Sequence, residues 1–531
     1  MQIKSITDKL SVSGQIMPSE ISDVAKAGFK SIIVNRPDGE GADQPTFAEI
    51  ESAAKKLGIA ARYIPVVSGK VTDVDAALFG KAMAEMPGPV VAFCRSGARS
   101  TMIWDMSQRL GTSATKAKDG PVVTSADIVI VGGGAAGIAA ASSLLARRRD
   151  LDIVIIDPAD THYYQPGWTL VGAGVFTAQQ TAKQEASLIP HGVRWVKAAV
   201  AAFEPENNAV VLEGCPTITY KRLIVAPGLK LNWAGIEGLD ETLGKNGVTS
   251  NYRYDLAPYT WELVQNLKSG RAIFTQPPMP IKCAGAPQKA LYLSADHWFR
   301  NGALKNINIE FYNAGAVLFG VAHYVPALME YIEKYNAKLN FDHTLTKIDG
   351  PARKAWFTKA NADGTKETIE TTFDMIHVVP PQQAPDFVRS SPLADMAGWV
   401  DVDQATLRHK KYANIWSLGD VMNAPNAKTA AAARKQAPIV ANNILKDMGN
   451  AIGTAAYDGY GSCPLTVERG KIVFAEFGYG GKLLPTFPNW LINSQKPSKL
   501  AWLLKERILP PLYWKAMLKG KEWYAKPEVI G

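Results

Sequence analysis

The chain has 531 residues, 47% of them hydrophobic and 20% charged, and a net charge of +9 at pH 7. Because single cores rarely grow past about 250–300 residues, three or more domain-sized units are expected, with ample material for buried cores. The four cysteines form no C-x-x-C pair, so neither a zinc site nor a disulfide scaffold is indicated, and no metal is expected. No basic run has the spacing of a helix-turn-helix or a zinc finger, which makes nucleic acid the weaker explanation of the charge.

Residues 1–108 are predicted to form a small α/β domain. Helix-like segments (18–27, 47–57 and 73–86) alternate with strand-like segments (31–34, 61–65 and 89–93). This alternation predicts a mostly parallel sheet covered by helices. The small polar stretch that follows is fit for a linker, which we place at residues 109–124. The start of the chain lacks the apolar core of a signal peptide, so a cytoplasmic location is expected.

A cysteine follows the last strand of this domain. The strand continues into Cys94-Arg-Ser-Gly-Ala-Arg99-Ser100 and then into a helix. A cysteine in this position lies among converging backbone N–H groups at the positive end of a helix. These dipoles, with Arg95 and Arg99, would lower the pKa of the thiol and favour the thiolate. Cys94 and Arg99 are therefore predicted as catalytic residues, and the alternative is an inert cysteine in an anion-binding turn.

A dinucleotide-binding pattern comes next in the chain. A β-branched run leads into Gly132-x-Gly134-x-x-Gly137 and an Ala-rich helix, and a second β-branched run ends at Asp157, twenty residues past Gly137. The glycines permit a tight turn, close approach to a pyrophosphate and helix–strand packing, and the acid accepts from a ribose. We predict a cofactor domain built from residues 125–265 and 381–450.

Residues 266–380 are predicted to form a second Rossmann-like domain. It has strands at 271–275 and 307–312 and a helix around 288–299. Its first strand leads into a Pro-rich turn that contains Cys283, whereas a pyrophosphate cradle needs the amide donors that prolines lack. NAD(P)H is therefore an unlikely reductant, and Cys283 is predicted to replace the nicotinamide site. The alternative for Cys283 is a packed loop residue.

The end of the chain, residues 451–531, interleaves tryptophans and tyrosines with leucines and lysines. No run reaches the ~20 apolar residues of a membrane span. Short helices of this composition suit an anchor that lies in the headgroup layer of a membrane surface. The alternatives are a dimer interface or helices that cover the core, and the oligomeric state stays open.

Two resemblances follow from these motifs. Residues 2 to 108 look like a small tyrosine-phosphatase-like family found fused to sulfur-handling proteins. True phosphatases hold five residues between the cysteine and the arginine, whereas only four separate Cys94 from Arg99, a loop similar to that of rhodaneses, whose cysteine carries a persulfide. Asp73 is only a weak candidate for a general acid. Transfer of sulfane sulfur is therefore favoured over phosphatase activity.

The stretch Thr161-His-Tyr-Tyr-Gln-Pro-Gly-Trp resembles sulfide:quinone oxidoreductases, particularly their mitochondrial-type branch. The agreement continues through Ile281-Lys-Cys-Ala-Gly-Ala-Pro, Lys428-Thr-Ala-Ala-Ala and Leu512-Tyr-Trp-Lys, and spans about residues 125 to 526. The resemblance implies a flavoprotein that binds FAD. The cofactor-binding residues that it implies, together with the glycine motif, are Gly132, Gly134, Ala135, Ala136, Gly137, Asp157, Gln165, Gly228, Gly419, Asp420, Lys428 and Thr429.

The resemblance also implies electron transfer from sulfide or a related sulfur species to a membrane quinone, on the inner face of the cell membrane. A low-molecular-weight thiol is a possible sulfur acceptor. The positions that match the family's two redox cysteines hold Thr249 and Val421, and neither can carry a persulfide. Cys283 is then the predicted catalytic thiol of this part. The rival hypotheses are an NAD(P)H:quinone reductase and a redox sensor without turnover.

Overall fold

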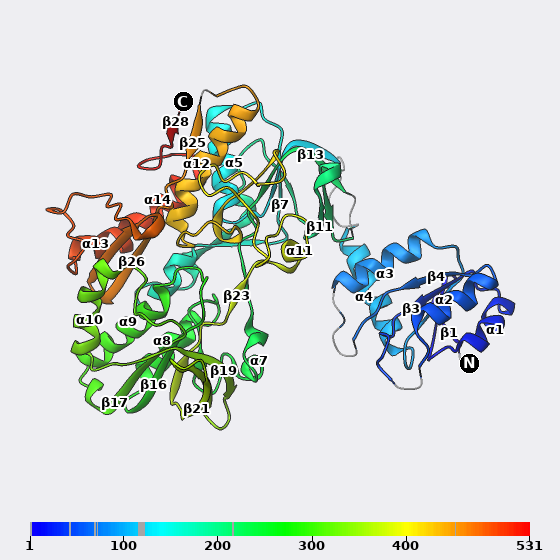
Figure 1. Ribbon diagram of the computed structural model, residues 1–531, viewed down its shortest axis with the longest axis horizontal. Helices are drawn as coiled ribbons and strands as arrows, with labels where there is room; N and C mark the ends of the chain where they lie inside the picture. Colours follow the sequence, from blue (N-terminus) through cyan, green and yellow to red (C-terminus); the bar gives the residue numbers. More distant parts are fainter. Residues whose placement is uncertain are drawn as a thin grey trace. The chain divides into compact units, whose positions relative to one another are not determined.

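The computed structural model describes residues 3–41, 44–67, 71, 73–114, 123–214, 217–451 and 453–530. The chain divides into two compact units: one comprises residues 1–124 with 211–218, and the other comprises the rest. Figure 1 shows mixed α/β structure in both units. The expected fold class, a small α/β domain followed by two Rossmann-like domains, is confirmed by the sheets described below.

The first unit contains a five-stranded sheet in the order β1-β2-β5-β3-β4. Its strands are β1 (Ile3–Ser5), β2 (Leu10–Ser13), β3 (Ser31–Val34), β4 (Ala60–Tyr63) and β5 (Val90–Phe93), and all neighbours except β1 and β2 are parallel. Its helices are α1 (Ile21–Lys26), α2 (Phe47–Lys56), α3 (Asp73–Glu85) and α4 (Ala98–Ala114). Consecutive residues of β3 point to opposite faces, so Ile32 and Ile33 belong to two separate cores.

Strand β5 occupies the middle of this sheet, and the chain passes from β5 through Cys94 into α4. A central parallel strand that feeds a helix presents the intervening turn at the sheet's carboxyl edge. Helix α4 continues to Ala114, so residues 109–114, expected as linker, are helical. Residues 115–122 of the expected linker lie outside the described residues.

The second unit begins with the sheet that carries the glycine motif. Parallel strands stand in the order β10-β7-β6-β13, and β24 pairs with β13 on the other side. Their bounds are β6 (Ser125–Val131), β7 (Ile153–Ile156), β10 (Arg194–Val196), β13 (Ile218–Val225) and β24 (Ile415–Ser417). Helices α5 (Ala135–Arg147) and α12 (Ala430–Asp447) pack against each other. The chain thus leaves this sheet after β13 and returns to it with β24.

Between β13 and β24 the chain forms a second parallel sheet, in the order β15-β22-β16-β17-β18. Its strands are β15 (Val248–Thr249), β16 (Gly270–Gln276), β17 (Ile307–Asn313), β18 (Lys338–Phe341) and β22 (Met375–His377). Helices α8 (Ala257–Asn266), α9 (Ala286–Arg300) and α10 (Val325–Lys334) share one core with it, centred on Phe274 and Trp298. The antiparallel strands β19 (His343–Asp349), β20 (Lys354–Ala360) and β21 (Lys366–Thr372) share another, with Phe357 stacked on Tyr312.

The last part of the chain is a hairpin followed by short helices. The hairpin strands are β26 (Gly461–Glu468) and β27 (Lys471–Phe477), and the helical segments are α13 (Lys499–Leu503), a π-helical turn (Leu504–Ile508) and α14 (Leu509–Lys515). Strand β26 packs on α9, with Cys463 and Leu465 in the shared core. Within the described part of the chain, none of the helices has the length and apolarity needed to span a membrane.

Candidate functional site

The glycine motif forms a turn that has no room for side chains at two positions. A Cβ on Gly132, where φ is +105°, would lie 2.3 Å from the carbonyl oxygen of Ala226, and a Cβ on Gly137 would lie 1.9 Å from the carbonyl oxygen of Gly132. Gly134, by contrast, faces open space and is the N-cap of α5, which receives no cap from a described side chain. The amide groups at the start of α5 are thus open to a bound anion.

Two acids stand beside this turn. Asp157, at the end of β7, accepts hydrogen bonds from the amides of Gly133 at 2.6 Å and Ala159 at 2.8 Å. Glu185 is buried next to Gly133 and pairs with Nδ1 of His162 at 3.0 Å. Burial raises the pKa of Glu185, an effect that His162 partly offsets. The turn and its acids have the arrangement that holds the ribose and pyrophosphate of a dinucleotide.

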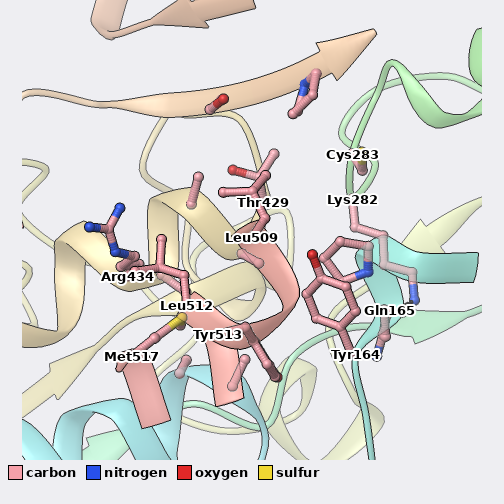
Figure 2. Close-up of a pocket in the computed structure, with 18 of the residues that line it drawn as sticks. Tyr164, Gln165, Lys282, Cys283, Thr429, Arg434, Leu509, Leu512, Tyr513 and Met517 are labelled. Carbon is pink, nitrogen blue, oxygen red and sulfur yellow. Dashed lines mark hydrogen bonds between the residues drawn. The ribbon is translucent and has the colours of Figure 1, made fainter. Parts of the chain in front are cut away.

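A single cavity of about 1200 Å³ starts at this turn and continues to the C-terminal helices. Figure 2 shows Cys283 and Lys282 on one side of it, Arg434 and Met517 on the other, and Thr429 between them. The sequence-predicted residues that line the cavity are Gly134, Ala135, Ala136, Asp157, Gln165, Gly228, Cys283, Gly419, Asp420, Lys428 and Thr429. Thr249 is not among its lining residues, because its buried hydroxyl bonds to Leu256 and Thr260.

Buried polar groups along this cavity lack hydrogen-bond partners among the described residues. They include Oε1 of Glu185, both amide atoms of Asn251, and Nε and one terminal nitrogen of Arg434. A buried polar group without a partner costs free energy, so such groups mark where a polar ligand binds. Together with the open glycine turn, they fit a large dinucleotide cofactor.

Two lysines and an aspartate lie between the turn and the thiol. Lys428 donates to the carbonyl oxygens of Asp420 at 2.8 Å and Met422 at 2.7 Å, and burial lowers its pKa to about 8. Lys282 donates to Oε1 of Gln165 at 2.6 Å, and burial also lowers its pKa to about 8. Helix α12 begins at Ala430, with the Thr429 hydroxyl as its N-cap. Lys428 therefore holds the loop of residues 420–422 while its charge stays at the cavity wall.

The predicted catalytic thiol, Cys283, lies in the turn before α9. Nζ of Lys289 is 3.2 Å from its sulfur, and the amide of Cys283 donates to the carbonyl oxygen of Lys428 at 2.8 Å. A hydrogen bond from the Cys463 thiol lowers the pKa of Cys283, burial raises it, and the charges of Lys289 and Lys505 bring it well below the usual value for a thiol. These contacts favour the thiolate form of Cys283, which lines the cavity.

The C-terminal helices close the far end of the cavity with apolar side chains. Leu504, Leu509 and Leu512 line it, and Tyr513 is buried with its hydroxyl 2.6 Å from Nε2 of His162. Other apolar side chains line the cavity and are also exposed to solvent: Leu491, Leu500, Ile508, Trp523 and Tyr524. Some side chains of this segment thus cover the core, and its exposed apolar side chains form an apolar entrance to the cavity.

The first unit carries a separate site at Cys94. The thiol is buried and accepts a hydrogen bond from the amide of Gly97 at 3.2 Å. Burial raises its pKa, but the backbone N–H groups of the loop outweigh that effect, so the pKa lies below the usual thiol value. Arg99 donates to Glu40 at 2.7 Å and to the carbonyl oxygen of Val66 at 2.5 Å, whereas Arg95 is exposed. The side chain of Asp73 lies outside the described part of the chain.

Comparisons with known proteins agree with both units. Residues 2–111 match the family model of the phosphatase-like domain of beta-lactamase hydrolase-like proteins, and residues 126–265 match that of pyridine nucleotide-disulphide oxidoreductases. A mitochondrial sulfide:quinone oxidoreductase of Dictyostelium discoideum is 43% identical over 377 residues, covering 71% of this chain and 81% of the relative. That of Mus musculus is 39% identical over 369 residues, covering 70% and 81%.

Among solved structures, the sulfide:quinone oxidoreductase of Aquifex aeolicus superposes with a TM-score of 0.63 at 21% identity, over 75% of this chain and 92% of that chain. The paired Rossmann-like domains and their glycine turn define a flavin-dependent oxidoreductase. Given the identity and coverage of the curated relatives, the chain belongs to the sulfide:quinone oxidoreductase family. The expected family is confirmed, and so is the phosphatase-like nature of the first domain.

The structure adds residues that the sequence reasoning missed. Glu185, Asn251 and Arg434 bring unsatisfied polar groups to the cavity, and Lys289 and Lys505 bring charge to Cys283. Lys289 lies six residues after Cys283, at the start of a predicted helix, so its nearness in the sequence was a usable signal. The others come from distant segments and carry no local pattern.

Proposed function

We propose that the protein is an FAD-dependent sulfide:quinone oxidoreductase whose first domain accepts and transfers sulfane sulfur. One observation carries this proposal: a single cavity joins the glycine turn, the Cys283 thiolate and the apolar entrance of the C-terminal helices. The glycine turn suits a nucleotide cofactor, Cys283 supplies a sulfur nucleophile, and the apolar entrance suits an apolar oxidant.

The FAD would be held by the glycine turn and Asp157 at its dinucleotide end and by the loop of Gly419 and Asp420 further along the cavity. When bound, the flavin takes up two electrons and passes them to a second substrate. The chain's own contribution is electrostatic. Burial lowers the pKa of Lys428 to about 8, so the ammonium group is charged at neutral pH and favours added negative charge nearby.

Sulfide, or a related small sulfur species at the same oxidation level, would be joined to the Cys283 thiolate as a persulfide, with the bound flavin as the acceptor of the two electrons released and one proton lost from hydrosulfide. The chain supplies a thiolate there, because Lys289 lies 3.2 Å from the sulfur and the start of α9 follows. Thiolates, rather than thiols, are the nucleophiles and leaving groups of sulfur exchange. A low-molecular-weight thiol is the proposed sulfur acceptor.

The quinone would enter from a membrane surface. Exposed apolar side chains surround the entrance, with Ile508 47%, Trp523 59% and Tyr524 76% exposed. Aromatic and leucine side chains of this kind insert into the headgroup layer, where lysines add about 1 kcal/mol each on anionic lipid. We therefore propose peripheral association with the inner face of the cell membrane.

Cys94 would receive sulfane sulfur as a persulfide and pass it on. Backbone N–H groups surround its sulfur and stabilise an anion, and Arg99 is held in place by Glu40. Only four residues separate Cys94 from Arg99, and the short loop that they form suits a sulfur species better than a phosphoryl group. Fusion of the two domains raises the effective concentration of one thiol site at the other.

The test is quinone reduction by purified, FAD-loaded protein, with sulfide and NADH as alternative reductants. We expect sulfide to support reduction of a soluble quinone and NADH to fail, because the turn after β16 contains prolines at 277, 278 and 280 where a pyrophosphate needs amide donors. Reduction by NADH but not by sulfide would overturn the proposal in favour of an NADH:quinone reductase. Failure of both would favour a sensor.

A further inference from the structure

Glu185 is a second buried acid beside the glycine turn. Its side chain is 2% exposed and lines the cavity, and its Oε1 has no hydrogen-bond partner among the described residues. A Cβ on Gly133 would lie 2.8 Å from this oxygen and 2.9 Å from the Cβ of Asp157, so both acids pack against the same glycine. A buried carboxylate oxygen without a partner costs free energy, which a ligand that supplies a donor would recover.

The two acids differ in how many hydrogen bonds they already accept. Both oxygens of Asp157 accept a backbone N–H, one from Gly133 and the other from Ala159. Each carboxylate oxygen has two lone pairs, so Asp157 keeps part of its capacity, whereas Oε1 of Glu185 keeps all of its own. An adenosine ribose presents two neighbouring hydroxyl donors. Two acids on one glycine therefore suit the two hydroxyls of one ribose.

The other oxygen of Glu185 is the first link of a hydrogen-bond chain that ends in the C-terminal segment. Nδ1 of His162 lies 3.0 Å from Oε2 of Glu185, and Nε2 lies 2.6 Å from the hydroxyl of Tyr513 in α14. With Nδ1 protonated, the ring donates to the carboxylate and accepts from the hydroxyl, so each group has a partner. All three side chains are buried. The chain of hydrogen bonds thus runs from the glycine turn to α14.

A second connection between the glycine turn and the C-terminal segment runs through α5. The Ser142 hydroxyl donates to the carbonyl oxygen of Leu518 at 2.9 Å, and Arg147 donates to Glu522 at 2.9 Å. A Cβ on Gly520, where φ is +68°, would lie 2.4 Å from the carbonyl oxygen of Ser142, so the segment rests directly on this helix. The helix whose first turn is open to a bound anion therefore also supports the end of the chain.

We propose that Glu185 binds, together with Asp157, the ribose of the bound dinucleotide. His162 and Tyr513 are positioning residues that hold its carboxylate, and they couple cofactor binding to the docking of α14. If the docked helix strengthens cofactor binding, the cofactor must strengthen the docking of the helix by the same factor. The inference rests on the proposed function, because the dinucleotide is the FAD of that proposal.

The coupling bears on the apolar part of the cavity. Leu509 and Leu512 of α14 line it, so the docking of this helix completes that wall. A protein without its cofactor lacks one of the contacts that hold α14 in place, whereas a loaded protein has it. Cofactor binding and assembly of the apolar entrance thereby go together.

The experiment is the rate at which the FAD-loaded, full-length protein releases flavin, followed by the rise in flavin fluorescence after dilution into buffer without FAD. Glu185→Met removes the ribose acceptor and the partner of His162, and we expect release at least about tenfold faster than in the wild type. Glu185→Gln keeps an acceptor oxygen and is expected to restore most of the difference. Tyr513→Phe removes only the far hydroxyl of the chain, and we expect release about fivefold faster.

The matched control is Tyr412→Phe. It also removes a tyrosine hydroxyl that donates to a glutamate, Glu206, at 2.5 Å, and neither residue lines the cavity. We expect it to leave flavin release unchanged. The reciprocal measurement is hydrogen–deuterium exchange of residues 509–522, which should be faster in Tyr513→Phe and in wild-type protein stripped of FAD, but not in Tyr412→Phe.

The possible results separate the parts of the proposal. Unchanged flavin release in Glu185→Met would overturn the role of Glu185, and exchange in residues 509–522 that does not respond to FAD removal would overturn the coupling. If Glu185→Met does not fold, release from Tyr513→Phe at the rate of Tyr412→Phe would overturn the proposal. A folded wild-type protein that binds no FAD would instead refute the proposed function.

Discussion

Lys289 is the charged group nearest to the Cys283 sulfur, and its replacement by methionine tests why that thiol is ionised. Two unit charges 3.2 Å apart interact by about 5 kcal/mol at an effective dielectric constant of about 20. Lys289 is buried and Cys283 is half-buried, and the charge of the buried Lys505 also lowers the pKa of Cys283. Because 1.36 kcal/mol corresponds to one tenfold change in ionisation, Lys289→Met is expected to lower the rate of Cys283 alkylation at pH 7 at least about tenfold.

The assay is the iodoacetamide alkylation rate of Cys283, followed by peptide mass from pH 5 to 10. Removal of the ammonium group raises the pKa of the thiol, so the rate profile should move to higher pH. Lys289→Arg is expected to restore part of the neutral-pH rate, and Lys305→Met, which removes an exposed lysine of the same domain, should leave it unchanged. An unaltered profile in a folded Lys289→Met protein would refute the electrostatic reasoning.

Gly137→Ala, whose Cβ would lie 1.9 Å from the Gly132 carbonyl oxygen, should purify without FAD, as its visible absorbance will show; a full flavin spectrum would contradict the turn's role. Cys94→Ser should abolish sulfur transfer from thiosulfate to a small thiol, and an aryl phosphate should be hydrolysed no better by the wild type than by this variant. Burial lowers the pKa of Lys505 to about 7 from an ordinary 10.5, so the unfolded state binds a proton that the folded state lacks between these values. The thermal stability of the wild type relative to Lys505→Met should therefore rise between pH 7 and 10, and a constant difference would be evidence against it. Replacing exposed Leu503 and Ile508 by serine should weaken co-sedimentation with anionic liposomes, and undiminished binding would place the membrane contact elsewhere.

The parts of this protein that were predictable from sequence are those in which local residue types dictate local geometry. A Cβ cannot be accommodated at Gly132 or Gly137, so the glycine spacing alone identifies the turn. The β-branched runs before Gly132 and Asp157 are buried on both faces of a parallel sheet, and that pattern is visible without a structure. The position of Cys94 after a buried strand likewise predicts its loop of N–H donors.

The parts that were not predictable depend on segments far apart in the chain. Cys463 belongs to a hairpin strand, and the thiol to which it is hydrogen-bonded, that of Cys283, lies 180 residues earlier in the turn before α9. Arg434 sits in an Ala-rich helix, where a charged residue is normally solvated, yet two nitrogens of its guanidinium are buried at the cavity without a hydrogen-bond partner among the described residues. In the C-terminal segment Tyr513 is buried, as expected of helices that cover the core, while Trp523 is exposed to solvent.

The hydrogen bonds of Lys428 were also not predictable from the sequence. The motif places it correctly at the cavity, but its ammonium group donates to the carbonyl oxygens of Asp420 and Met422. Carbonyl acceptors are available at every residue, so no sequence pattern shows which of them a lysine will bind. The position of a charge could be predicted here, whereas its hydrogen-bond partners could not.

The measurement that tests the central claim most directly is the visible absorbance of the bound flavin under anaerobic conditions, first with sodium sulfide and then with a soluble quinone. The account predicts that sulfide bleaches the flavin, that quinone restores it, and that Cys283→Ala shows neither change while retaining its flavin. A flavin that stays oxidised in the presence of sulfide, in protein whose Cys283 is a free thiolate, would contradict the account.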